Sequence, residues 1–389
     1  MFCFFKHHTN KRKMKEITMM EGNSVTAYPP IISLIENILH KGYKINFVGN
    51  GISKLSRDIL DNPNFNGMEI GCEINGTINI LRRIPMRFYV NHKARKYVRE
   101  SMKHSELLWT NSYEAVKTLG KMVTNYKHVM QFMELVDNGY IYKKIIRFPL
   151  VDYAKKAWKI VVCEKNRAYI HKAMWGLNSL PYVLPNKPYN ISTYEITSEM
   201  VKPLEIIKNE KRKVILYLGG IFSDRNLRPF AESIQKLEQY VFYIVGYAVD
   251  EKSKKQLSEL INIYGAIYLG SFTAPKHLEF VKYAHIGLLS YSTVEGDIIG
   301  SINSLYCAPN KLYEYASFGK PMIGNDILGL KEPFEEYNIG LCCDENSSES
   351  VTKCLRKIEE NYEIMSKNCE KFFKGTDLDS IVDEILEGE

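Results

Sequence analysis

Short apolar runs alternate with longer stretches in which apolar residues recur every three or four positions. The short runs predict strands and the longer stretches predict helices, a pattern typical of βα units built around parallel sheets. In the first half, strands are predicted at residues 16–20, 44–48, 107–110, 128–132 and 159–163. In the second half, they are predicted at residues 214–218, 241–245, 266–269, 286–290 and 321–324. Helices are predicted at residues 30–40 and 227–237.

The predicted elements fall into two sets, separated by a polar stretch that contains Pro188 and Pro203. The net charge of +7 is divided unevenly between the two halves of the chain. Residues 1–195 contain 30 Lys and Arg against 15 Asp and Glu, whereas residues 196–389 contain 22 against 30. Opposite charges on the two halves indicate two domains with different partners. We therefore predict a basic leader at 1–13, an N-terminal domain at 14–187, a linker at 188–212 and a C-terminal domain at 213–389.

The composition indicates a folded protein without a membrane span. The 389 residues are 45% hydrophobic and 25% charged, which is ordinary for a globular protein with two cores. No apolar run reaches the roughly 18 residues that a bilayer requires, and the apolar start is too short for a signal peptide. The eight Cys lack metal-ligand spacing and are interpreted as reduced thiols. We therefore expect a cytoplasmic protein.

The stretch from Pro309 to Pro321 contains the most specific candidate chemistry. Pro309 suits the start of a helix, and Gly319 followed by Pro321 suits its end. Lys311 and Glu314 are three residues apart and therefore share one face near the start of that helix. A cation and exposed N–H groups suit a diphosphate, while a carboxylate suits the hydroxyls of a sugar. An ordinary surface helix with an ion pair is the alternative.

A second candidate follows the predicted strand 214–218. Gly219 and Gly220 come directly after this strand, and Arg225 lies shortly before the next predicted helix. Paired glycines let backbone N–H groups approach a phosphate closely, and an Arg near a helix start can neutralise it. Most such turns bind nothing, but here the helix with the Lys and the Glu follows in the same predicted domain. Together these features indicate a site for a nucleoside diphosphate.

Five segments, in order along the chain, resemble the donor domain of GT-B glycosyltransferases, in particular the family-4 or group 1 enzymes. These segments are residues 218–227, 268–272, 283–291, 309–321 and 326–336. Residues 157–167 and 181–188 resemble, more loosely, that family's passage into its interdomain linker. The resemblance implies an α/β fold of the GT-B type, in which two Rossmann-like domains face each other across a cleft.

The same resemblance implies roles for individual residues. Glu314 would accept hydrogen bonds from the ribose hydroxyls, while Arg225 and Lys311 would hold the diphosphate and act in catalysis by stabilising its departure. The implied donor-binding set is Gly219, Gly220, Arg225, Ser271, Phe272, Cys307, Ala308, Pro309, Asn310, Lys311, Leu312 and Glu314.

No metal or other cofactor is expected. The resemblance implies that cations and the end of a helix stabilise the leaving diphosphate, in place of the metal that other glycosyltransferases use. The one Asp-x-Asp motif, from Asp377 to Asp379, suits the first turn of a last helix better than a metal site.

The chain departs from the family pattern at several positions. Tyr306 stands eight residues before Glu314, where the family usually has a second Glu that meets the donor sugar. Gly220 stands where the family usually has a basic residue, and residues 27–30 replace a glycine pair in the N-terminal domain. The identity of the donor sugar is therefore left open.

In the N-terminal domain, the predicted strand 128–132 leads into a turn with Glu134 and Asp137. A carboxylate at the end of a parallel strand can point into a cleft and activate or position an acceptor hydroxyl. We therefore expect catalytic contacts from Glu134 first and Asp137 second; a solvated turn is the alternative. Met133 stands where family members often have His, and His128, at the start of the strand, is interpreted as structural.

Residues 80–103 form a basic stretch with interleaved apolar residues and a single Glu. Its candidate docking cations are Arg82, Arg83, Arg87, Lys93, Arg95, Lys96 and Arg99. Such a stretch suits peripheral contact with an anionic membrane, and a solvated helix face is the alternative. Nucleic acid is not expected as a partner, because no RNA-binding motif accompanies these charges.

The combined prediction is a cytoplasmic glycosyltransferase that is peripheral at the inner face of the membrane. It would move a sugar from a nucleotide donor, UDP-linked rather than GDP-linked, to a glycan or lipid-linked oligosaccharide in surface polysaccharide biosynthesis. Metal independence and retention of configuration are implied by the resemblance. The alternatives are a nucleotide-sugar epimerase on the same scaffold and a non-catalytic module that binds nucleotide-sugar or glycan, which Tyr306 and Met133 favour.

Overall fold

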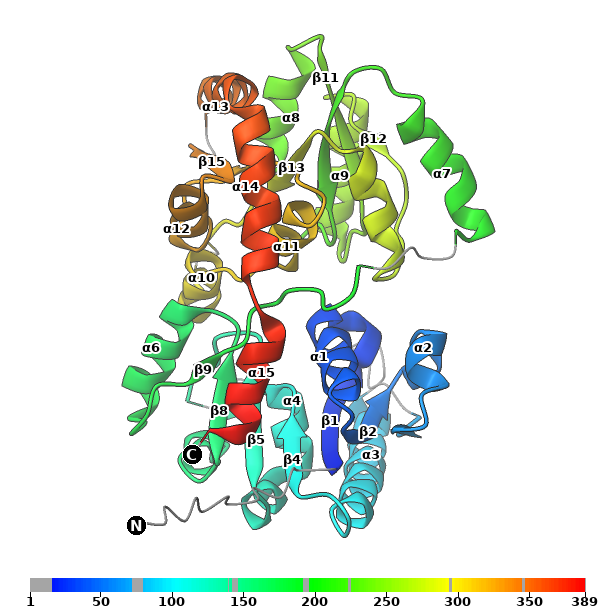
Figure 1. Ribbon diagram of the computed structural model, residues 1–389, viewed down its shortest axis with the longest axis vertical. Helices are drawn as coiled ribbons and strands as arrows, with labels where there is room; N and C mark the ends of the chain where they lie inside the picture. Colours follow the sequence, from blue (N-terminus) through cyan, green and yellow to red (C-terminus); the bar gives the residue numbers. More distant parts are fainter. Residues whose placement is uncertain are drawn as a thin grey trace, which may run out of the picture.

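The computed structural model describes residues 16–71, 80–138, 140–141, 146–191, 196–222, 225–293, 296–344 and 347–388. The side chains of residues 80–84, 140–141 and 146 lie outside this description, as does the predicted leader at 1–13. The chain forms two α/β domains, one above the other in Figure 1, each with a central sheet flanked by helices. This arrangement is the GT-B fold that the sequence predicts.

The N-terminal sheet has seven parallel strands in the order β3-β2-β1-β4-β5-β8-β9. They are β1 (Glu16–Ser24), β2 (Lys44–Asn50), β3 (Phe65–Glu69), β4 (Leu107–Thr110), β5 (His128–Phe132), β8 (Lys159–Val162) and β9 (Tyr182–Val183). A separate antiparallel pair consists of β6 (Tyr140–Ile141) and β7 (Ile146–Arg147). The α-helices of this domain are α1 (Pro29–His40), α2 (Arg57–Leu60), α3 (Ile80–Ser101), α4 (Tyr113–Leu119), α5 (Leu150–Ala154) and α6 (Lys165–Trp175). Short 3-10 helices are η1 (Val25–Ala27), η2 (Ile52–Lys54) and η3 (Gly120–Asn125).

The C-terminal sheet has six parallel strands in the order β12-β11-β10-β13-β14-β15. They are β10 (Lys213–Leu218), β11 (Tyr240–Val245), β12 (Ile267–Tyr268), β13 (Ile286–Leu289), β14 (Met322–Asn325) and β15 (Gly340–Cys343). The helices before and between these strands are α7 (Ser198–Lys208), α8 (Arg228–Gln235), α9 (Glu251–Asn262), η4 (Lys276–Tyr283), α10 (Ile298–Leu305), α11 (Asn310–Ala316) and α12 (Leu328–Tyr337). The chain ends with α13 (Ser348–Glu360), α14 (Tyr362–Gly375) and α15 (Leu378–Glu387).

The apolar pattern predicts every strand that lies inside the two large sheets, together with the edge strand β12. In β10, Val214, Leu216 and Leu218 enter one hydrophobic core, whereas Ile215 and Tyr217 enter the core on the other face. All ten predicted strands are present, and burial on both faces, which gives continuous apolar runs, explains the nine that lie inside the sheets. The edge strands β3 and β9, which the sequence did not predict, contain no buried residue, and the edge strand β15 is buried only at its two ends.

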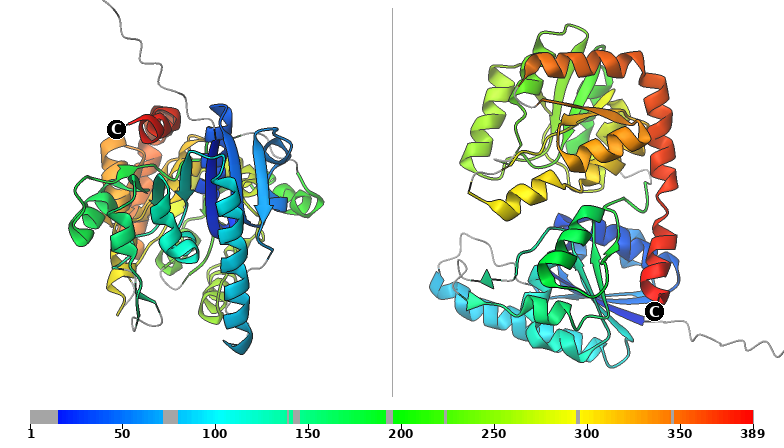
Figure 2. Two further views of the ribbon diagram at one scale, coloured as in Figure 1. Left: turned by 90° about the horizontal axis from the view of Figure 1, so that it is seen from below. Right: turned by 90° about the vertical axis from the view of Figure 1, so that its left-hand side faces the viewer.

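Two helices change the predicted domain boundaries. The predicted linker at 188–212 contains α7, whose Met200, Leu204 and Ile207 are buried in a core of the C-terminal domain. The predicted C-terminal domain includes α15, which instead packs on the N-terminal sheet through Leu378, Val382, Ile385 and Leu386. Figure 2 shows α14 and α15 running along the side of both domains.

The last helix is fixed to the N-terminal domain by a buried ammonium group. Lys159 Nζ, in β8, donates hydrogen bonds to the carbonyl oxygens of Glu384 (3.1 Å), Ile385 (2.9 Å) and Gly388 (2.8 Å). A cation at these carbonyls also complements the negative end of the helix dipole. The chain therefore crosses between the domains twice and ties them together.

Glu21, in β1, is a fully buried carboxyl group. Its Oε1 accepts hydrogen bonds from the backbone N–H of Asn23 (2.9 Å) and the hydroxyl of Ser112 (3.0 Å). Its Oε2 is enclosed without a hydrogen-bond partner among the described residues. Burial raises the pKa of Glu21 from 4.5 to about 7, against the opposing effect of these hydrogen bonds.

We predict that Glu21→Gln weakens the pH dependence of folding stability. Between the unfolded pKa near 4.5 and the folded pKa near 7, the folded protein keeps a proton that the unfolded chain has released. Stability therefore falls as pH rises through this window, by about 3 kcal/mol for the full shift. Chemical unfolding at pH 5 and pH 7.5 should show that the free energy of unfolding falls less between these pH values in the variant than in the natural chain. The control Glu106→Gln, at an exposed carboxylate, should keep the natural dependence, and an unchanged dependence in Glu21→Gln would contradict the prediction.

Candidate active site

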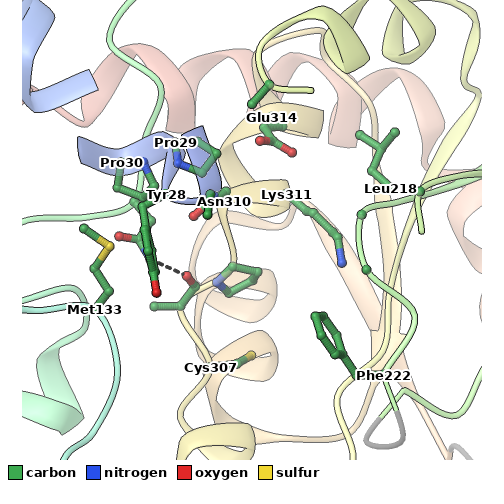
Figure 3. A pocket seen from close by; sticks show the side chains of 18 of the residues that line it. Tyr28, Pro29, Pro30, Met133, Leu218, Phe222, Cys307, Asn310, Lys311 and Glu314 are labelled. Carbon is green, nitrogen blue, oxygen red and sulfur yellow. Dashed lines mark hydrogen bonds between the residues drawn. The ribbon is translucent and has the colours of Figure 1, made fainter. Parts of the chain in front are cut away.

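A cleft of about 940 Å³ lies between the two domains, and both domains contribute to its walls. The C-terminal domain contributes the ends of β10, β11 and β13, the turn after β12, and parts of η4, α10 and α11. The N-terminal domain contributes residues that follow β1 and β5 and one residue of α6. Figure 3 shows Tyr28 and Met133 on one side of this pocket and Leu218 and Phe222 on the other. Ligands of parallel α/β sheets bind at such an edge, outside the carboxyl ends of the strands.

The glycine turn after β10 brings backbone to the surface of the cleft. Gly219 has a φ of +96°, a left-handed conformation that favours glycine. A Cβ added to Gly246, at the end of β11, would lie 1.9 Å from the carbonyl oxygen of Gly219. A Cβ on Gly219 would lie 3.1 Å from Cε of Lys311. This part of the cleft is therefore formed by closely packed backbone, with the Lys311 side chain directly beside it.

Arg225 and Lys311 both lie near the buried ring of Tyr291. The guanidinium carbon of Arg225 is 4.0 Å from the centre of this ring, and Nζ of Lys311 is 5.6 Å from it. Lys311 Nζ is also 4.4 Å from the centre of the Tyr217 ring, whose hydroxyl donates to the Gly220 carbonyl at 2.8 Å. Burial raises the pKa of Tyr291 well above its usual value of 10, so this phenol remains neutral. Two cations beside neutral rings create a positive potential that favours a bound anion.

The helix predicted after Pro309 is present as α11, with Pro309 as its N-cap. Lys311 and Glu314 lie one turn apart on this helix and both line the cleft (Figure 3). Leu312 was predicted to contact the donor, but it is 6% exposed and belongs to the hydrophobic core of the domain. It lies outside the cleft because successive helical residues point in different directions.

Glu314 is 5% exposed, and its Oε1 lies 3.2 Å from Nε2 of His277 on η4. Phe272, which also lines the cleft, stacks on Phe280 with 4.8 Å between the ring centres. Apart from Leu312, the predicted donor residues lie together in this one cleft: Gly219, Gly220, Arg225, Ser271, Phe272, Cys307, Ala308, Pro309, Asn310, Lys311 and Glu314.

The structure places one of the two predicted acceptor-side carboxylates in the cleft. Glu134 lines the cleft with a side chain that is 71% exposed, and its Oε2 lies 3.3 Å from Nη1 of Arg167. Asp137 lies outside the residues that line it. His128 is buried, with Nε2 at 2.8 Å from the hydroxyl of Thr110, and burial lowers its pKa to about 3. His128 is therefore neutral and structural, as the sequence suggested.

Arg167, on α6, joins the two domains at the cleft, a role that the sequence did not indicate. Its buried guanidinium donates to the carbonyl oxygens of Tyr306 (2.8 Å) and Asn303 (3.0 Å) in the C-terminal domain. It also donates to the carbonyl oxygen of Met133 (2.6 Å) in the N-terminal domain. One rigid fork of N–H groups thus fixes the segment before Glu134 against the C-terminal end of α10.

A side-chain amide adds a second connection beside Arg167. Asn303 Oδ1 accepts from the backbone N–H of Leu135 at 2.6 Å, and Asn303 Nδ2 donates to the Leu135 carbonyl at 3.1 Å. Asn186 Nδ2 donates to the Ala308 carbonyl at 2.8 Å. These hydrogen bonds fix the position of one wall of the cleft relative to the other. Each of them joins residues that are more than a hundred positions apart in the chain.

Comparison with known proteins shows the fold of the chain and a family match for most of its C-terminal domain. Residues 202–374 match the family model described as glycosyl transferases group 1, and no match was found among curated protein sequences. The chain is similar to the structure of sucrose-phosphate synthase from Thermosynechococcus elongatus, with a TM-score of 0.67, 11% identity and coverage of 95% of this chain and 97% of that one.

Two further structures have similar scores. HepE from Anabaena, in complex with UDP and glucose, gives a TM-score of 0.64 at 14% identity, with 96% of this chain and 98% of that chain covered. WaaG, a glycosyltransferase involved in lipopolysaccharide biosynthesis, gives a TM-score of 0.63 at 12% identity, with 96% of this chain and 100% of that chain covered. The chain therefore has the GT-B fold, and its residues 202–374 match the group 1 glycosyltransferases.

The chain has Met and Tyr at two positions where the resemblance expects His and Glu. Met133 lines the cleft, and Tyr306 uses its backbone carbonyl to accept from Arg167. Cys307 also lines the cleft, and burial raises the pKa of its thiol to about 12, so it remains protonated.

No group of three or more His, Cys, Asp or Glu residues within the described part of the chain could hold a metal ion. Asp377 of the Asp-x-Asp motif is the N-cap of α15, as predicted, and accepts from the backbone N–H groups of Asp379 and Ser380. The Asp377 carboxylate therefore caps a helix, and the Asp379 carboxylate accepts from Nδ2 of Asn37 at 3.0 Å.

Proposed function

We propose that this glycosyltransferase moves a sugar from a UDP-sugar to a glycan or lipid-linked oligosaccharide acceptor in surface polysaccharide biosynthesis. The convergence of Arg225, Lys311 and Glu314 in one interdomain cleft carries this proposal. The choice of UDP is supported by the UDP that accompanies the similar HepE structure, and the pathway by the stated role of WaaG.

The diphosphate is proposed to bind between Arg225 and Lys311, next to the backbone of Gly219. In the reaction, the bond between the sugar C1 and the diphosphate oxygen breaks, and the acceptor hydroxyl oxygen forms a bond to C1. The electron pair of the broken bond leaves with the nucleoside diphosphate, whose growing negative charge the two cations stabilise. We propose that these cations make a metal unnecessary and that the configuration at C1 is retained, as in the family that the chain resembles.

Glu134 is the carboxylate that we propose to meet the acceptor hydroxyl. Three carboxylates line the described cleft: Glu134, Asp297 and Glu314. Asp297 caps α10 by accepting from the backbone N–H of Gly300 at 2.9 Å, and Glu314 lies against His277. Glu134 extends from the acceptor domain with most of its surface accessible, so it can accept the proton that the hydroxyl loses.

We predict that the purified protein releases UDP from a suitable UDP-sugar in the presence of EDTA. Arg225 and Lys311 already supply the positive charge that the leaving diphosphate requires. A panel of UDP-, GDP- and ADP-sugars, assayed for free nucleoside diphosphate with and without Mg²⁺, measures this. Binding without release would contradict the proposal and indicate a binding module, whereas conversion of the donor to its epimer would indicate an epimerase.

We predict that Glu314→Ala weakens UDP binding by about 1.5–3 kcal/mol, the usual contribution of hydrogen bonds to a charged acceptor. Titration calorimetry with UDP measures the change, and the thermal midpoint of unfolding confirms that the variant is folded. The control Glu335→Ala removes an exposed carboxylate of α12 outside the cleft and should keep the natural affinity. Equal affinities for the natural protein and Glu314→Ala would remove this residue from the site.

We also propose that α3 docks on an anionic membrane. Phe88 is 73% exposed. The exposed residues Lys96 and Arg99 follow it at spacings that place all three on one face of the helix.

The other candidate cations of α3 have different surroundings. Lys93 and Arg95 donate to the Ile70 carbonyl (2.7 Å) and the Thr118 carbonyl (2.9 Å) within the domain. Arg87 is exposed, while the side chains of Arg82 and Arg83 lie outside the described residues. None of the described helices is both long and apolar enough to cross a bilayer.

We predict that the triple variant Arg87→Ser, Lys96→Ser and Arg99→Ser sediments less with vesicles containing phosphatidylglycerol. Each basic residue near such a surface contributes about 1 kcal/mol, so the partition coefficient should fall about a hundredfold. The matched triple change of Lys252, Lys254 and Lys255 to Ser, on α9, should leave sedimentation unchanged. Equal sedimentation of both triple variants would rule out docking through α3.

A further inference from the structure

His277 lies directly beside the carboxylate that is proposed to bind ribose. Its Nε2 is 3.2 Å from Oε1 of Glu314, and both residues line the cleft. Because Nε2 faces a carboxylate oxygen, we assign a hydrogen to this ring nitrogen, which can then be donated to Glu314. His277 was not among the residues that the sequence indicated.

The contact meets a need that burial creates. The Glu314 side chain is 6% exposed, and a carboxylate withdrawn from water requires a hydrogen-bond donor. Within the described residues, His277 Nε2 is the side-chain nitrogen that the structure records at ion-pair distance from this carboxylate. The imidazole therefore occupies one oxygen and fixes the plane of the carboxylate, and the second oxygen, Oε2, is the one left for a ligand.

Both residues extend from rigid elements. His277 is next to Leu278 and close in sequence to Phe280 and Val281, all of which are buried in the core of the C-terminal domain. Glu314 is next to Tyr315, which is fully buried and donates to the Leu216 carbonyl at 2.7 Å. A carboxylate held between two anchored elements is oriented before the ligand arrives, which lowers the entropic cost of binding.

The other ring nitrogen of His277 also indicates a ligand. Nδ1 is enclosed and has no hydrogen-bond partner among the described residues. With the hydrogen on Nε2, Nδ1 is an acceptor. An O–H or N–H group bound in the cleft, or a water molecule that accompanies it, can satisfy this atom.

We propose that His277 is a positioning residue that aligns Glu314 with the two ribose hydroxyls, so that the site selects ribonucleotides over 2′-deoxyribonucleotides. The proposal rests on the proposed donor site and adds a determinant of its specificity. A carboxylate oxygen aligned with a vicinal diol accepts from both hydroxyls, and loss of the 2′-hydroxyl leaves it short of one donor.

The test compares UDP with 2′-deoxy-UDP by titration calorimetry in the natural protein, His277→Ala, Glu314→Ala and the double variant. We expect the natural protein to prefer UDP by about tenfold or more. In His277→Ala, both the UDP affinity and this preference should fall, and the double variant should be no worse than Glu314→Ala alone. In His277→Gln, whose amide N–H can still donate, part of the preference should return.

A matched control comes from the same domain. His285 Nε2 lies 2.7 Å from Oε1 of Glu359, a His–Glu contact between residues that do not line the cleft. His285→Ala should keep the natural preference for UDP.

The outcomes separate this inference from the proposed function. If His277→Ala keeps the natural preference for UDP over 2′-deoxy-UDP while Glu314→Ala loses it, the role of His277 is overturned and the proposed donor site stands. If the losses of UDP binding free energy in the two single variants add up in the double variant, the role of His277 is likewise overturned. An unchanged preference and affinity in Glu314→Ala would overturn the proposed donor site and this inference with it.

Discussion

Positive charge held at the carboxyl edge of the C-terminal sheet is the feature on which the rest of the site depends. Arg225 reaches this edge from the loop after β10, and Lys311 reaches it from the first turn of α11. Both cations lie against neutral rings, and Tyr291 is near both of them. Like charges repel, so their proximity is favourable only where aromatic faces and a bound anion offset the repulsion. The glycine turn at Gly219 would leave room for the proposed anion, because no side chain projects from this position.

Much of this edge could be predicted because its signals are local. Gly219 follows an apolar strand, and Lys311 and Glu314 lie within one helical turn after a proline, so spacing alone places them. Leu312 was predicted in the cleft because the motif was treated as a continuous stretch, whereas successive residues of an α-helix are rotated by about 100° and Leu312 points into the core. The strands inside the sheets were predictable because burial on both faces leaves an unbroken apolar run, which the exposed edge strand β3 lacks.

The remaining features depend on contacts between distant parts of the chain. Arg167 and Asn303 come from different domains, and no spacing relates them. His277 is close to Glu314 only because η4 and α11 pack on the same core. The domain boundaries failed for a similar reason, since Pro203 was interpreted as part of a linker although it lies within α7, and α15 has an apolar face that fits either domain by sequence alone. The sequence pattern within one element predicts whether it is a helix or a strand, whereas tertiary packing decides on which domain it packs.

The distribution of charge between the two walls of the cleft also bears on the proposed chemistry. On the donor wall, two cations lie beside buried rings, where a low local dielectric strengthens their effect on a leaving diphosphate. On the acceptor wall, Glu134 is largely exposed, and its charge is screened by water and by Arg167. Met133, in the same wall, and the protonated thiol of Cys307 contribute no charge at neutral pH. Stabilisation of the leaving group therefore contributes more to the proposed reaction than activation of the acceptor, and the rigid contacts of Arg167 and Asn303 chiefly serve to bring the acceptor hydroxyl within reach.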